Sequence, residues 1–220
     1  TTEIYTLSLH DALPILSEMI FWFEIAGTIV FALSGAMAAA RKNLDIFGFL
    51  VVALAPAIGG GTLRDLFLGQ TPVFWVEQNV FLYVCFAAAI FTFFWAHKVA
   101  SRFTLLIWCD AFGLALFATL GTERALQADV SDLVAVIMGT LTAIAGGLIR
   151  DIICGEIPLI LRKEIYAMAA IFGSSTYLWS WKIWQEPSLA LAMGFFATIA
   201  VRGAAIKYGW SMPIYKRTIG

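Results

Sequence analysis

The segment GGGTLRD at residues 59–65 recurs as AGGLIRD at residues 145–151, an offset of 86 residues. The same offset, without a gap, aligns identical or similar residues on both sides of this segment. The aligned pairs are Gly69 with Gly155, Gln70 with Glu156, Pro72 with Pro158, Glu24 with Asp110, Phe31 with Phe117, and Gly35 with Gly121. So many matches in one register are a poor fit to chance, and the sequence therefore predicts an internal duplication.

The composition identifies the solvent of this chain as lipid. Only 13% of the 220 residues are charged, against roughly 25% in soluble globular proteins. Hydrophobic residues make up 61%, and the mean hydropathy is +0.86. A soluble domain of this size cannot bury that much apolar surface. The 14 basic and 15 acidic residues leave a net charge of −1, so no basic surface for nucleic acid is expected.

Seven apolar runs are long enough to be membrane-spanning helices, which need about 20 residues each. The runs are continuous rather than alternating, which favours helices over a β-barrel. The second and fifth are interrupted by glycines. The expected spans are residues 21–40, 46–61, 79–96, 104–122, 133–147, 165–181 and 188–206.

The duplication groups these spans as three, three and one. Because each copy has an odd number of spans, the second copy enters the membrane from the opposite side, which predicts a pseudo-two-fold axis in the membrane plane. The sequence thus predicts an all-α integral membrane protein with an inverted 3+3 repeat plus one helix. The expected units are a first repeat at 20–103, a second at 104–186, a seventh helix at 187–207 and a cytoplasmic tail at 208–220.

Residues 1–16, TTEIYTLSLHDALPIL, have mixed polarity and no features of a signal peptide. The stretch resembles translated sequencing-adapter read-through. We predict that it is non-native or disordered and that the native chain starts near Met19; a native amphipathic arm is the alternative.

Basic residues predict the orientation. If the side on which the first span begins is named side A, the opposite side, side B, collects eleven Lys and Arg residues and side A three. Side B is therefore expected to be cytoplasmic, with the N-terminus outside and the C-terminus inside. Arg202, late in the seventh span, is expected to extend toward the cytoplasmic surface.

The glycine runs predict breaks in the second and fifth helices. Each glycine costs roughly 1 kcal/mol in a helix relative to alanine. A broken helix in lipid must line a protein-enclosed cavity, and two inverted breaks would form a polar translocation site. The alternative is that the glycines only permit close helix packing.

The duplicated Arg-Asp pairs allow two interpretations. Inverted symmetry suggests cross-pairing of Arg64 with Asp151 and of Arg150 with Asp65. Alternatively, each arginine reaches the interface while its neighbouring aspartate caps the next turn. The acids Glu24 and Asp110 are either favourable helix N-terminal charges or ligands along a cation path.

The paired G-G-G-x-x-R-D and A-G-G-x-x-R-D motifs, each followed by G-[QE]-x-P, resemble the bacterial glycine-transporter-domain family. These proteins are prokaryotic relatives of the trimeric intracellular cation (TRIC) channels. The resemblance covers about residues 20–207. It implies seven helices, a homotrimer in the bacterial inner membrane, and one pore per protomer beside kinked second and fifth helices. It implies potassium as the permeant, although some bacterial members are assigned glycine uptake.

The sequence therefore predicts a TRIC-like potassium channel, with a glycine or small-amino-acid permease as the alternative and a non-conducting scaffold as a third possibility. No catalytic triad, metal site or phosphate loop is present, so no enzyme activity, cofactor or resident metal is expected. The predicted pore or substrate-binding residues are Gly59, Gly60, Gly61, Arg64, Asp65, Gly146, Gly147, Arg150 and Asp151, with Glu24 and Asp110 as possible acidic path residues.

Overall fold

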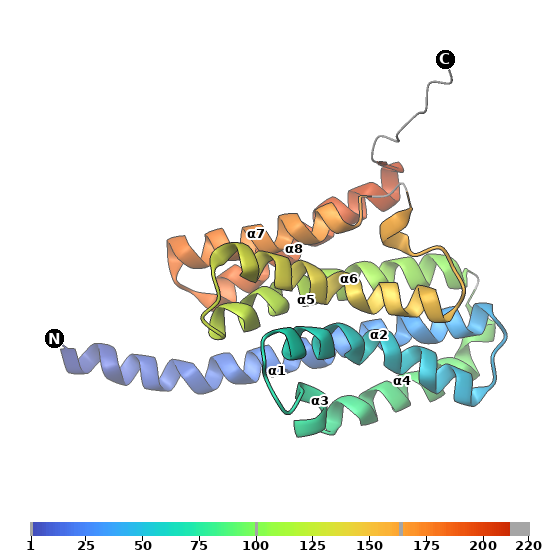
Figure 1. Cartoon of the computed structure of the whole chain (residues 1–220), viewed down its shortest axis with the longest axis horizontal. Coiled ribbons are helices and arrows are strands. Elements are labelled where there is room, and N and C mark those ends of the chain that lie inside the picture. Colours follow the sequence, from blue (N-terminus) through green and yellow to red (C-terminus); the bar gives the residue numbers. More distant parts are fainter. Residues whose placement is uncertain (1, 100, 163–164, 212–220) are drawn as a thin grey trace, which may run out of the picture.

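The computed structural model describes residues 2–99, 101–162 and 165–211, with side chains from Glu18 onward, and is built from helices (Figure 1). The helices are α1 (Thr2–Arg41), α2 (Ile46–Phe67), α3 (Phe74–Glu77), α4 (Val80–Trp95), η1 (Ala96–Lys98), α5 (Arg102–Gln127), α6 (Asp132–Ile153), η2 (Leu159–Leu161), α7 (Ala167–Trp184) and α8 (Pro187–Tyr208). The predicted tail beyond residue 211 lies outside the described residues.

Six of the seven predicted spans are long and apolar enough to cross a membrane: α1 from Glu18, α2, α4 with η1, α5, α6 and α8. The remaining one, the sixth predicted span at 165–181, corresponds to α7, an 18-residue helix whose polar stretch Gly173–Thr176 lowers its hydropathy. This helix packs along α8 and against α5 and α6. That α7 itself spans the membrane stays a prediction.

The first helix is longer than its predicted span. Its backbone is helical from Thr2, so residues 2–16 continue α1 and extend beyond the bundle (Figure 1). That these residues are non-native stays a prediction.

Both glycine-containing helices are continuous. Each of α2 and α6 is a single α-helix of 22 residues through its glycines, so the predicted breaks are wrong. The glycines instead bring the two helices into backbone contact. A Cβ on Gly60 would lie 2.2 Å from the carbonyl oxygen of Thr142, and one on Gly146 would lie 2.5 Å from that of Pro56. The close packing of the two helices compensates for the low helix propensity of glycine, as contacts between small residues do in other membrane helices.

These contacts reveal the inverted symmetry directly. The offset of 86 converts Gly60 into Gly146 and Pro56 into Thr142, so the two close approaches are exchanged by one rotation. Reciprocal contacts of this kind define a two-fold relation. Between the two contacts, the residue number rises from 56 to 60 on α2 and falls from 146 to 142 on α6, so the two helices are antiparallel. The axis therefore runs across the helices, as the sequence predicted.

The contact between α1 and α5 has the same symmetry. The rings of Phe31 and Phe117, which are equivalent positions, stack on each other with centroids 5.2 Å apart and planes 9° apart. A Cβ on Gly27 would lie 2.9 Å from the ring of Phe117, and one on Gly113 would lie 2.5 Å from that of Phe31. Each ring thus occupies the space that a glycine leaves on the opposite helix.

The remaining helices surround this centre. The helix α4 packs against α1 and α2, whereas α7 and α8 pack against α5. The outer faces carry large exposed hydrophobic side chains, as lipid contact requires; examples are Phe47, Tyr83, Leu133, Trp179 and Phe196.

The glycine contact yields a matched test. Gly60→Ala forces a methyl group against a backbone carbonyl and should destabilise the fold by about 1–3 kcal/mol. At Gly59 the added Cβ would meet only the tip of Ile149, 2.7 Å away, which is able to move. Thermal unfolding in detergent should therefore show a lower midpoint for Gly60→Ala than for Gly59→Ala. Equal midpoints would contradict the packing role of Gly60.

Candidate functional site

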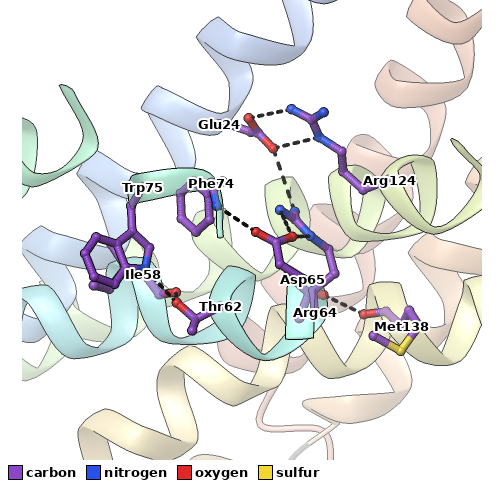
Figure 2. Close-up of polar contacts among 10 residues, drawn as sticks. Glu24, Ile58, Thr62, Arg64, Asp65, Phe74, Trp75, Arg124 and Met138 are labelled. Carbon is purple, nitrogen blue, oxygen red and sulfur yellow. Dashed lines mark hydrogen bonds and ion pairs between the residues drawn. The ribbon is translucent and has the colours of Figure 1, made fainter. Parts of the chain in front are cut away.

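A cluster of four charged side chains lies at the side A end of the bundle. We name Glu24, Arg64, Asp65 and Arg124 the A cluster (Figure 2). Arg124 donates two hydrogen bonds to the Glu24 carboxylate, at 3.0 and 2.9 Å. Arg64 forms an ion pair with Asp65 at 2.8 Å and lies 3.7 Å from Glu24. Two acids and two arginines make the cluster neutral, as burial in lipid requires.

Asp65 also holds the segment after α2. Its Oδ1 accepts a hydrogen bond from Arg64 Nε at 2.9 Å, while its Oδ2 accepts one from the backbone N–H of Phe74 at 2.9 Å. Trp75 Nε1 donates to Thr62 Oγ1 at 2.9 Å (Figure 2). The carboxylate thus binds the first backbone N–H of the short helix α3 and links α3 to the buried charges. The interpretation in which the arginines reach the interface is wrong, because Arg64 and Arg150 are buried.

The second repeat forms an equivalent cluster at side B. We name Ser34, Asp110, Arg150 and Asp151 the B cluster. Arg150 Nη1 contacts Asp110 Oδ1 at 2.6 Å and Ser34 Oγ at 2.5 Å, and Nη2 contacts Asp151 Oδ1 at 2.8 Å. Asp151 Oδ2 accepts from the backbone N–H of Leu159 at 2.9 Å. Arg150 and Asp110 are completely buried.

The predicted cross-pairing of the repeats is wrong. Arg64 pairs with the acids Glu24 and Asp65 of its own repeat, and Arg150 does the same with Asp110 and Asp151. The reason is the inversion itself. Equivalent positions near the ends of α2 and α6 lie at opposite sides of the membrane, so the two Arg-Asp pairs are too distant to exchange partners.

The acids Glu24 and Asp110 are not helix N-terminal charges. Both lie within helices, at least eight residues from the helix start, and both are buried partners of arginines. Glu24 lies on α1 and Asp110 on α5, the first helix of each repeat. Together they place one carboxylate at each end of the bundle interior.

Two further arginines lie outside the repeat pattern. Arg124 of α5 reaches the A cluster, although its counterpart at the same offset in the first repeat is Ala38. Arg202 of α8 is completely buried, with its guanidinium 5.0 Å from the ring of Tyr166. The prediction that Arg202 extends to the surface is therefore wrong. The repeat could not predict the surroundings of either residue, because Arg124 aligns with an alanine and Arg202 lies outside the duplicated spans.

The two ends differ in their access to solvent. At side A, a pocket of about 450 Å³ is lined by both acids and both arginines of the A cluster, together with Gln70 and Glu77. At side B, the cavity next to Asp151 has only about 10 Å³, room for a single water molecule.

The rim of the side B cavity is basic. Arg41, Lys42 and Arg162 lie 3.5, 3.1 and 3.5 Å from the carboxylate of Glu156. The hydrogen bond from Lys42 and the charges of the two arginines lower the pKa of Glu156 below its ordinary value. This surface carboxylate therefore stays ionised and ties the loop after α6 to the end of α1.

Taken together, these features define a polytopic helical membrane protein, built from an inverted repeat, that buries a charge cluster near each side of the bilayer.

The family comparison agrees with the duplication. The glycine transporter family matches residues 21–97 and again 107–182, so the two matches begin 86 residues apart. The chain belongs to this family. It is 39% identical over 203 residues to a UPF0126 membrane protein of Vibrio cholerae, covering 92% of this chain and 85% of that protein. It is 38% identical over 200 residues to the UPF0126 inner membrane protein YadS of Escherichia coli, covering 90% and 96%.

Solved structures of TRIC channels share the fold. The TRIC trimeric intracellular cation channel orthologue from Rhodobacter sphaeroides is 43% identical, with a TM-score of 0.85, over 87% of this chain and 99% of that one. A prokaryotic TRIC channel crystallised in 0.5 M KCl is 28% identical, with a TM-score of 0.84, over 89% and 100%.

The geometry of the clusters gives a double-mutant test. Asp110→Ala or Arg150→Ala alone leaves a buried charge without its partner and should destabilise the protein by about 3–5 kcal/mol. The double variant should recover at least ~1 kcal/mol relative to additivity, because the two groups are in contact. The control pair, Asp65→Ala with Arg150→Ala, should be additive. Unfolding midpoints in detergent measure both cycles, and coupling in the control pair alone would contradict the assignment.

Proposed function

We propose that the chain is a TRIC-like monovalent cation channel of the bacterial inner membrane, with a permeation path inside each protomer and potassium as the main permeant. The observation that carries this proposal is the placement of two equivalent charge clusters near opposite sides of the membrane. The A cluster is built on α1, α2 and α5, and the B cluster on α1, α5 and α6. The similarity to TRIC cation channels over nearly the whole chain supports the same function.

The path follows one face of α1. Glu24, Thr28, Phe31, Ser34 and Ala38 recur at helical spacing, and all five are buried. The first lines the side A pocket, and the last lines the side B cavity. This stripe therefore connects the two solvent-facing ends through the centre of the protomer.

The charge at the side A mouth favours cations. The pocket is lined by Glu24, Asp65 and Glu77 against Arg64 and Arg124, a net charge of −1. Clefts lined by one sign of charge concentrate the opposite ion. Because each cluster acid is already paired with an arginine, the expected preference among monovalent cations is weak.

A second function, uptake of glycine or a similar small amino acid, is favoured by one specific observation. Arg64 Nη1, beside the side A pocket, is 3.7 Å from Glu24 Oε1, an ion pair too long for a hydrogen bond, and it makes no hydrogen bond within the described residues. A carboxylate entering the pocket would accept a hydrogen bond from this group, and the ammonium of the same zwitterion would meet the nearby acids.

Assembly and orientation complete the proposal. We expect a homotrimer, because the Rhodobacter sphaeroides relative is a trimeric channel. The excess of basic residues at side B supports a cytoplasmic side B, with the N-terminus outside. The side A pocket then faces the periplasm.

Planar-bilayer recording with a potassium gradient tests the two functions. The channel predicts unitary currents that reverse near the potassium equilibrium potential. Saturable uptake of labelled glycine into liposomes, without unitary currents, would replace the channel with the permease.

The mouth charge predicts the effect of one exposed acid. Glu77→Gln should lower the unitary potassium conductance in dilute salt, on the order of twofold, because the mouth loses its net negative charge. The difference should vanish near 1 M salt, where the screening length is about 3 Å. Glu186→Gln is the matched control, since this exposed acid lies at the α7–α8 connection and does not line the pocket. An equal effect of both variants would argue against an entrance at this pocket.

A further inference from the structure

We propose that the stacked rings of Phe31 and Phe117 are the hydrophobic gate of the permeation path. The inference rests on the proposed channel function. The rings are 0% and 3% exposed, with centroids 5.2 Å apart. They belong to equivalent positions of the two repeats, so the pair lies on the pseudo-two-fold axis, midway between the two mouths.

The rings separate the two polar ends of the path. Along α1, Glu24 of the A cluster and Ser34 of the B cluster are ten residues apart, about 15 Å at the helical rise. Between them the buried stripe of α1 contributes only Thr28 and Phe31. An ion that leaves the A cluster must therefore pass the aromatic pair before it reaches Ser34. Apolar constrictions of this kind exclude water and so block ions.

The surroundings fix the rings in the closed position. Each is seated against the glycine of the opposite helix, Gly113 for Phe31 and Gly27 for Phe117. Phe31 also lies near Gly146, where a Cβ would be 3.2 Å from its ring. Neither ring has space to rotate into the facing helix, so the pair opens only when α1 and α5 move apart. Because the pair is symmetric, both repeats contribute equally to that movement.

The chain supplies a matched aromatic pair away from the path. Phe49 of α2 and Phe93 of α4 also pack ring to ring, with centroids 5.1 Å apart. Phe49 is buried to a similar degree, yet neither residue belongs to the α1–α5 contact. Truncating Phe49 creates a comparable packing defect without touching the proposed gate.

Single-channel recording of the full-length protein tests the gate. Phe31→Ala and Phe117→Ala should each raise the time-averaged potassium current on the order of tenfold, because the constriction becomes wide enough to hold water. Phe31→Leu should stay near the wild type, and Phe49→Ala should not increase the current. If the alanine variants do not fold, Phe31→Asn tests the same point, since asparagine is close in size to the leucine of the Phe31→Leu control but is polar and so hydrates the site.

An accessibility experiment gives a readout that does not depend on current. In a background with Cys85, Cys109 and Cys154 replaced by alanine, Gln78→Cys and Ser34→Cys are treated from side A with a cationic methanethiosulfonate reagent. Gln78, which is exposed and lines the side A pocket, should react as cysteine in either case, whereas Ser34→Cys should react only when Phe31→Ala is also present.

The outcomes separate the gate from the channel. If the wild type conducts, but Phe31→Ala changes neither the current nor the reactivity of Ser34→Cys, the gate proposal is wrong and the channel proposal is unaffected. Absence of current in every variant, together with glycine uptake, overturns the channel proposal on which the gate rests.

Discussion

The requirement that charges in lipid be neutralised where they lie governs this structure. Each repeat buries an arginine near the end of its second helix, and each supplies two carboxylates that contact it. At side A, Arg124 balances the second carboxylate. Those contacts fix the depth of the first helix relative to the second, since Glu24 and Asp110 must reach the arginines. The neighbouring aspartates also bind the backbone of the following segment, so the loops at both ends are positioned by the same buried charges.

Between the charge clusters, the structure depends on close backbone contact. Gly60 and Gly146 let α2 and α6 approach until a carbonyl oxygen occupies the space of a side chain. Gly27 and Gly113 do the same for the aromatic rings of α1 and α5. These contacts hold the two repeats together without charged groups, so the buried charges of the two clusters are confined to the ends of the bundle. Because the charged residues lie at the ends and the stacked rings lie between them, an apolar barrier can separate the two charged mouths.

The repeat offset and the apolar runs predicted most of the fold, because both are properties of local sequence and composition. Six spans and the inverted relation of the copies follow from them, and Glu24 and Asp110 were recognised as equivalent. The glycine breaks were wrong because glycine lowers helix propensity in isolation, whereas in a packed pair the same residue enables a contact that compensates for that loss. The cross-pairing was wrong because it considered chemical complementarity without the depth of each pair in the membrane. The contributions of Arg124 and Arg202 could not be predicted, since both depend on which helix neighbours a cluster in space and neither has a charged counterpart in the repeat.

The origin of Arg202 in α8 has an evolutionary consequence. That helix lies outside the duplicated unit, and the position equivalent to Arg124 in the first repeat is an alanine. Two identical half-length subunits, paired about a two-fold axis, would present the same residues at both mouths and would lack α8. They could therefore neither place an arginine equivalent to Arg124 at one mouth only nor supply Arg202. The two halves of the chain have therefore diverged so far that two copies of either half could not form the present structure. The two ends of the bundle differ chemically, although the backbone that carries them is symmetric.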